Sequence, residues 1–235
     1  MTDSTTETTK EVSPRTIGIV WLSYLVVGIP ALSMLKRFLV QGDAAATAQN
    51  IVTHATLFQA AASIDFVGNA LYIVLTALLY RFFKPVKPGV ALAAAFFSLS
   101  GCIVQIMAGL LRIAAPVALT NPQLAAAFSA PQIQAAVLFG LRLYSKAFLI
   151  SFPLFALFEL LTAYLMLRST FIPRWLGVWW ALAGASWLIF MWPTLALAVQ
   201  PVIIAIGGPA ELAFAIWLIV KSRDIEGGRA TARGG

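Results

Sequence analysis

Six long runs of apolar residues, almost free of charge, constrain this sequence more than any other feature. They cover residues 17–35, 57–83, 90–118, 135–167, 175–192 and 201–220. A helix that crosses the ~30 Å hydrocarbon core of a bilayer needs about 20 mainly apolar residues. Backbone polar groups have no water to bind in lipid, so continuous runs of this length predict helices. We therefore expect an all-α integral membrane bundle of six transmembrane helices.

The composition excludes the soluble classes of protein. Hydrophobic residues make up 60% of the 235 positions and charged residues only 11%, whereas soluble domains carry about 25% charged residues. One cysteine, Cys102, cannot form an intrachain disulfide, and one histidine, His54, cannot build a multi-histidine metal site. We expect no metal and no cofactor.

The distribution of basic residues predicts the orientation in the membrane. Short loops rich in Lys and Arg stay in the cytoplasm. Eleven basic residues fall on one side, and only Lys36 and Arg37 on the other. The eleven are Lys10, Arg15, Arg81, Lys84, Lys87, Arg168, Arg174, Lys221, Arg223, Arg229 and Arg233. Both tails are then cytoplasmic, which requires an even number of spans. The net charge of +7 follows from this topology and from anionic lipid headgroups, so no nucleic-acid partner is expected.

The two tails and two of the loops differ in character from the apolar runs. Residues 1–15 and 222–235 are polar or rich in Gly and Arg and are predicted to be disordered, flanking a transmembrane domain at 16–221. Acidic residues precede the first run, which does not fit a cleaved signal peptide. Residues 41–56 are predicted to begin a short helix capped by Asp43, and residues 119–134 to hold a short Ala-rich turn between Asn-Pro and Ala-Pro breaks.

Three stretches of the sequence resemble a known family. They are GDAAATAQNIVTHATLFQ at 42–59, followed by Asp65, then RSTFIPRWLGVWWALAG at 168–184 and GGPAELAFAIWLIVK at 207–221. Together they resemble the bacterial multi-pass membrane proteins grouped as domain of unknown function four-three-eight-six. The resemblance implies an integral membrane protein of bacterial type, and hence the inner membrane, but it implies no activity.

Ionisable residues inside the apolar runs are the candidates for a functional site. Each costs about 2.5 to 3.5 kcal/mol on insertion scales, so such residues usually face the bundle interior or pair. Six occur: Asp65, Arg112, Arg142, Lys146, Glu159 and Glu211. All except Glu159 lie at or above mid-depth on the outer side. We therefore predict one outer-half cluster whose ligand-binding residues are Asp65, Asn69, Arg112, Arg142, Lys146 and Glu211.

Helical spacing supports part of this cluster. Asp65, Asn69, Tyr72 and Thr76 follow one another at i, i+4, i+7 and i+11, which makes one polar stripe on an apolar helix. Arg142 and Lys146 are spaced i, i+4 and repel, so an acid, a bound anion or a lipid headgroup must neutralise them. Asp65 is expected to pair with Arg112, Arg142 or Lys146, because an unpaired buried charge is costly.

Structural readings of the same residues stay open. An ion pair of Asp65 can equally serve only to link two helices, without any ligand. Arg112 and Lys146 can extend to the outer headgroups, and Glu159 can bond a neighbouring hydroxyl in its protonated form. The triplet Gly207-Gly208-Pro209 can break the last helix before Glu211, or can serve close packing.

The sequence supports several hypotheses for function. It contains no His-Glu-x-x-His, Gly-x-Ser-x-Gly or phosphate-loop motif, so no catalytic residue is assigned. The leading hypothesis is a protein that binds or translocates an amphiphilic or anionic small molecule, or a membrane lipid, in an outer-half polar cavity. The alternatives are a structural or regulatory membrane subunit without a ligand, and a membrane-embedded enzyme that uses Asp65 and Glu211.

Overall fold

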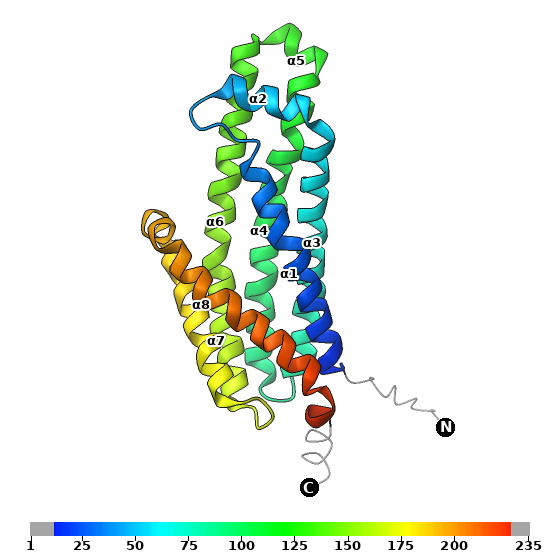
Figure 1. Cartoon of the computed structure of the whole chain (residues 1–235), viewed down its shortest axis with the longest axis vertical. Coiled ribbons are helices and arrows are strands. Elements are labelled where there is room, and N and C mark those ends of the chain that lie inside the picture. Colours follow the sequence, from blue (N-terminus) through cyan, green and yellow to red (C-terminus); the bar gives the residue numbers. More distant parts are fainter. Residues whose placement is uncertain (1–11, 227–235) are drawn as a thin grey trace, which may run out of the picture.

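The computed structural model describes residues 12–226, which form a long bundle of helices (Figure 1). In chain order the elements are α1 Pro14–Lys36, α2 Ala44–Thr53, α3 Ala55–Phe83, α4 Pro88–Thr120, α5 Pro122–Ala127, α6 Ala130–Arg168, α7 Arg174–Trp187, the 3-10 helix η1 Leu188–Met191 and α8 Pro193–Val220. No strand occurs in this part of the chain. The prediction of an all-α fold is confirmed.

Four helices, α3, α4, α6 and α8, are long and apolar enough to cross a membrane. The other two expected spans differ from these. α1 is apolar over Pro14–Gly28, and the run at 175–192 forms a 14-residue α7 that tightens into η1. The last helix begins at Pro193 instead of 201, and the fixed φ of Pro193 suits this first helical position.

The two ends of the described chain meet at one end of the bundle, the lower end in Figure 1. The Ser13 hydroxyl donates a hydrogen bond of 2.9 Å to the Glu226 carboxylate and lies 3.4 Å from the Ser222 hydroxyl. Helical structure continues through residues 222–226, which were expected to belong to a disordered tail. The rest of both expected tails, residues 1–11 and 227–235, lies outside the described residues.

The opposite, upper end carries the two short helices α2 and α5 (Figure 1). The Asp43 side chain caps α2 by accepting a hydrogen bond of 2.8 Å from the backbone N–H of Ala46, as predicted. Asn121 caps α5 through the N–H groups of Gln123 and Leu124. The expected Ala-rich turn between the two prolines is therefore α5.

The bundle has two regions, which we call lower and upper. The lower region packs α1, α7 and α8 around the lower halves of α3, α4 and α6, with Trp21, Leu75, Phe158, Trp180 and Phe214 in its core. The upper region consists of the upper halves of α3, α4 and α6 with α2 and α5. Its core contains Phe38, Phe58, Ala108, Leu141 and Tyr144.

Close helix contacts in this bundle depend on glycine. A Cβ atom at Gly18 of α1 would lie 2.5 Å from the Ala215 carbonyl oxygen of α8, and one at Gly101 of α4 would lie 2.7 Å from the Phe155 ring of α6. Small residues of this kind allow helix backbones in membranes to approach closely. The α1–α8 and α4–α6 contacts are fixed in this way.

α8 runs obliquely across the lower region without a break (Figure 1). Both Pro201 and Pro209 lie inside it. Membrane helices tolerate such prolines when neighbouring groups hold the freed backbone. A Cβ atom added at Gly207 would lie 3.3 Å from the Trp187 ring. Gly207 therefore serves packing, and the Gly-Gly-Pro triplet does not split the helix.

Candidate functional site

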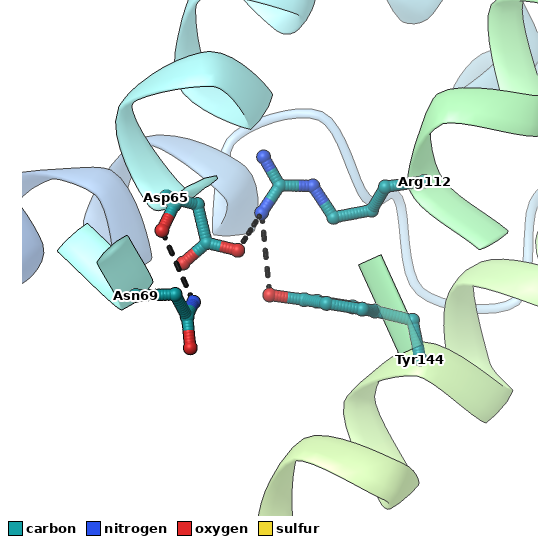
Figure 2. Close-up of polar contacts among 4 residues, drawn as sticks. All are labelled: Asp65, Asn69, Arg112 and Tyr144. Carbon is teal, nitrogen blue, oxygen red and sulfur yellow. Dashed lines mark hydrogen bonds and ion pairs between the residues drawn. The ribbon is translucent and has the colours of Figure 1, made fainter. Parts of the chain in front are cut away.

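The upper region holds a buried ion pair between α3 and α4 (Figure 2). Arg112 Nη1 lies 3.1 Å from Asp65 Oδ2, and the two side chains are 1% and 16% exposed. An uncompensated charge at this depth would be costly, so each group requires the other. The predicted pairing of Asp65 with one of the three cations is confirmed, and its partner is Arg112.

Tyr144 of α6 completes this arrangement from a third helix. Arg112 Nη1 donates a hydrogen bond of 3.2 Å to the Tyr144 hydroxyl. The guanidinium carbon also lies 5.2 Å from the centre of the Tyr144 ring, within reach of a cation–π interaction. The site thus joins α3, α4 and α6, and we call Asp65, Arg112 and Tyr144 the upper site.

Asn69 lies one turn below Asp65 on α3 and faces inward, as the predicted polar stripe requires. Its Nδ2 donates a hydrogen bond of 3.1 Å to the backbone carbonyl of Asp65, as Figure 2 shows. Thr76, further along the same stripe, lies 2.6 Å from the Ser98 hydroxyl of α4. Asn69 therefore bonds within α3, whereas Thr76 links α3 to α4.

Part of the Arg112 guanidinium has no partner. Nε and Nη2 are buried and make no hydrogen bond within the described part of the chain. These two N–H groups form the side of a guanidinium that binds a carboxylate or phosphate in bidentate fashion. A buried unsatisfied donor costs about 1–3 kcal/mol, so this side of Arg112 favours an added oxygen acceptor.

Arg142 and Lys146 do not join this cluster, contrary to the sequence prediction. Both side chains are exposed, and among residues 12–226 neither forms an ion pair. The reason is helical geometry. Each is two residues, about 200° of rotation, from Tyr144, and Tyr144 faces inward. The sequence prediction used only the depth of these residues along their helix. The two cations lie on the exposed face of α6, which points away from the bundle interior.

Glu211 also has different neighbours from those expected. It lies on α8, which packs against α1 and α7, and its Oε2 accepts a hydrogen bond of 3.4 Å from Trp21 Nε1. The predicted cluster is thus divided between two regions of the bundle. Within the described residues, no group of three His, Cys, Asp or Glu side chains could hold a metal ion.

Sequence reasoning missed Tyr144. A usable signal existed, because Val137, Leu141, Tyr144, Phe148 and Ser151 follow one another at spacings of three and four along α6. Such a stripe marks the face that enters the core, and it separates Tyr144 from the basic residues beside it.

The fold and the buried charges define a multi-pass helical membrane protein. The family model "Domain of unknown function (DUF4386)" matches residues 16–222, and the chain belongs to this family. The predicted resemblance is confirmed over nearly all of the helical bundle. No curated protein sequence and no solved structure matches the chain.

Proposed function

We propose that the chain crosses the bacterial inner membrane six times with both tails in the cytoplasm. Contact between Ser13 and Glu226 fits an even number of crossings. The basic residues Arg81, Lys84, Lys87 and Arg168 lie at or beside helix ends on that same lower end, as expected of a cytoplasmic face. In this proposal α1 and the α7–η1 segment complete the set of spans.

Reporter fusions test this topology. Fusions after residues 46, 86, 126, 171 and 197 should report outside, inside, outside, inside and outside. Residues 46 and 126 lie in α2 and α5 at the upper end, and residues 86 and 171 lie in turns at the lower end. A periplasmic signal at 86 would contradict the proposal.

We further propose that the upper site binds an anionic oxygen of an amphiphilic molecule, such as a lipid headgroup. The supporting observation is the unpartnered Nε–Nη2 side of Arg112, held in place by Asp65 and Tyr144 through Nη1 alone. A fixed guanidinium presents two parallel donors and loses little entropy on binding. Arg142 and Lys146, exposed on α6, would then attract anionic headgroups near the outer surface.

A purely structural role is the second candidate. The observation that favours it is that the same three residues tie α3, α4 and α6 together. The enzyme hypothesis gains no support from the geometry, because Asp65 bonds Arg112 whereas Glu211 bonds Trp21.

Arg112→Lys separates the first two candidates. Lysine keeps the positive charge beside Asp65 but removes the bidentate side of the guanidinium. We would measure Tm in detergent with and without a total extract of bacterial lipid, for the wild type, Arg112→Lys and the matched exposed control Arg142→Lys.

Ligand binding at Arg112 predicts that the lipid-dependent rise in Tm is lost in Arg112→Lys and kept in Arg142→Lys. A structural role predicts that Arg112→Lys lowers Tm equally with and without lipid. An unchanged lipid-dependent rise in Arg112→Lys would refute the binding proposal.

A further inference from the structure

Glu159 of α6 is a buried carboxyl group in the lower region. Its side chain is 4% exposed, and Oε2 has no hydrogen-bond partner among the described residues. α7 packs tightly over it, because a Cβ atom at Gly184 would lie 2.9 Å from Glu159 Cβ. A lone carboxylate in such surroundings is strongly disfavoured, so the neutral acid is the stable form.

A second acid, Glu211 of α8, lies on the same tryptophan cluster as Glu159. Trp21 Nε1 donates to Glu211 Oε2 at 3.4 Å, and the Trp21 ring lies 5.1 Å from the ring of Trp180, one turn of α7 from the Gly184 that covers Glu159. Neither of the ion pairs seen among the described side chains, Asp65–Arg112 and Lys221–Asp224, includes Glu159 or Glu211. Two carboxyl groups in one buried region without a cation do not both ionise readily.

The other helices around this pair also present no positive charge. Their titratable groups are the neutral hydroxyls of Tyr24 on α1 and Tyr72 on α3 and the thiol of Cys102 on α4. Trp180 of α7 adds an indole N–H that is buried and has no partner in the described chain. Polar hydrogen-bonding groups thus surround the two acids, but nothing present balances two negative charges.

The pair lies near the middle of the bilayer. Glu159 precedes the end of α6 at Arg168 by nine residues, or about 14 Å at 1.5 Å per residue. That is roughly half of a hydrocarbon core of about 30 Å. Acids at this depth in membrane proteins commonly belong to ion or proton pathways.

A small void lies among α3, α4 and α6, next to the turn of α6 that carries Glu159. Its volume is about 10 Å³, and Thr76, Tyr80, Ala91, Phe158 and Thr162 are among the residues that line it. This is about the space that one water molecule requires, and a water needs polar partners of the kind that the two threonines and Tyr80 supply. Thr162 lies one turn from Glu159 on α6, and Ala91 lies in the first turn of α4 at the lower end.

We propose that Glu159 and Glu211 form a proton-binding site that is filled from the lower end of the bundle through this void. A hydronium ion gives its proton to a carboxylate oxygen of the pair and leaves as water, and release reverses the step. The bound proton leaves the pair with a single negative charge, which the Trp21 N–H stabilises. This site is separate from the upper site and does not depend on a ligand there.

Infrared spectroscopy tests the site with the proton itself as the probe, because a protonated carboxyl group absorbs at a different frequency from a carboxylate. The full chain in lipid nanodiscs at pH 7 should show a carboxylic acid band. The double variant Glu159→Gln with Glu211→Gln should remove the band, because it removes both carboxyl groups that can hold the proton. Asp224→Asn, which removes an exposed carboxylate, is the matched control and should leave the band unchanged.

Absence of the band from the wild type would overturn the proposal. A band that survives in the double variant would overturn it as well. Far-UV circular dichroism and a monodisperse elution profile check that each variant is folded, and the wild-type spectrum decides the first outcome without any variant.

The route is tested by transfer into heavy water, which shifts the acid band as the proton exchanges. Thr162→Val and Thr76→Val remove hydroxyls from the void and should each slow the exchange about fivefold, since a lost hydrogen bond to the relaying water raises the barrier. Thr120→Val is the matched control, because Thr120 bonds its own helix at Pro116 as Thr76 does at Tyr72. Equal exchange rates in all four proteins would refute the route.

Discussion

The two buried acidic sites of the molecule differ in the charge placed beside each carboxyl group. In the upper region Asp65 faces the Arg112 guanidinium at 3.1 Å, and Tyr144 adds a hydroxyl and a ring face. In the lower region Glu159 has no ion-pair partner among the described side chains, and a second acid, Glu211, lies on the same tryptophan cluster. A buried carboxyl group is thus held as an ion in one region and favours the neutral form in the other.

This difference shows that burial alone does not determine the state of an acid in a membrane bundle. Ion pairing offsets part of the desolvation cost at Asp65, whereas no cation offsets it at Glu159 among the described side chains. Removal of either partner should consequently destabilise the upper site, whereas the lower site tolerates conversion of an acid to an amide. Substitutions in the two regions should therefore have effects of very different size.

The largest effect is expected from Arg112→Gln. It leaves Asp65 without its partner, and breaking a buried pair from one side costs about 3–5 kcal/mol of unfolding free energy. The double variant Arg112→Gln with Asp65→Asn should recover much of that loss. Unfolding in detergent by denaturant titration measures both, and a single variant as stable as the wild type would contradict the upper ion pair.

Tyr144→Phe should have the next largest effect. It removes a hydroxyl that accepts from a charged donor, a hydrogen bond worth about 1.5–3 kcal/mol, and keeps the ring over the guanidinium. Tyr164→Phe on the same helix is a suitable control, because Tyr164 is exposed and bonds only Lys87 among the described residues. Equal losses in both variants would show that Tyr144 adds no specific support to Arg112.

Glu159→Gln should change stability by no more than about 1 kcal/mol, because an amide replaces a neutral acid of the same shape and one buried polar group replaces another. The same denaturant titration measures it. A stabilisation of several kcal/mol would instead indicate that Glu159 is ionised and unpaired, and would contradict the contrast between the two regions.

The smallest effects are expected at Arg142 and Lys146. Each is exposed and unpaired within the described residues, so Arg142→Gln or Lys146→Gln should alter the unfolding free energy by less than about 0.5 kcal/mol. Loss of lipid-dependent stabilisation without loss of stability would assign them to headgroup contact. A loss of unfolding free energy as large as that of Arg112→Gln would show that Arg142 and Lys146 belong to the upper site.

Much of the fold could be predicted from the sequence because membrane helices must be long, apolar and punctuated by polar turns. The cap at Asp43 and the pairing of Asp65 were predicted from the chemistry of these side chains. The start of α8 was not, because Pro193 and Pro201 both offer the fixed φ of a first helical position and the sequence does not decide between them.

The composition of the sites was harder to predict than the fold. Residues were grouped by depth along their helices, which ignores rotation about the helix axis. Rotation separates Arg142 and Lys146 from Arg112, and the oblique path of α8 places Glu211 beside Trp21. The orphan N–H groups of Arg112 and the lone oxygen of Glu159 are properties of the packed bundle, and a sequence does not reveal them.

The close contact of α1 with α8 has a consequence for biogenesis. Gly18 meets Ala215, and Trp21 packs edge-on against Phe214 at 5.6 Å, so the first helix of the described residues is completed by their last long helix. During synthesis the partner surface of α1 therefore remains open until the ribosome has released the end of α8. A chain stalled after α7 would display that surface, with Trp21 at its centre, to the chaperones and proteases that survey the membrane.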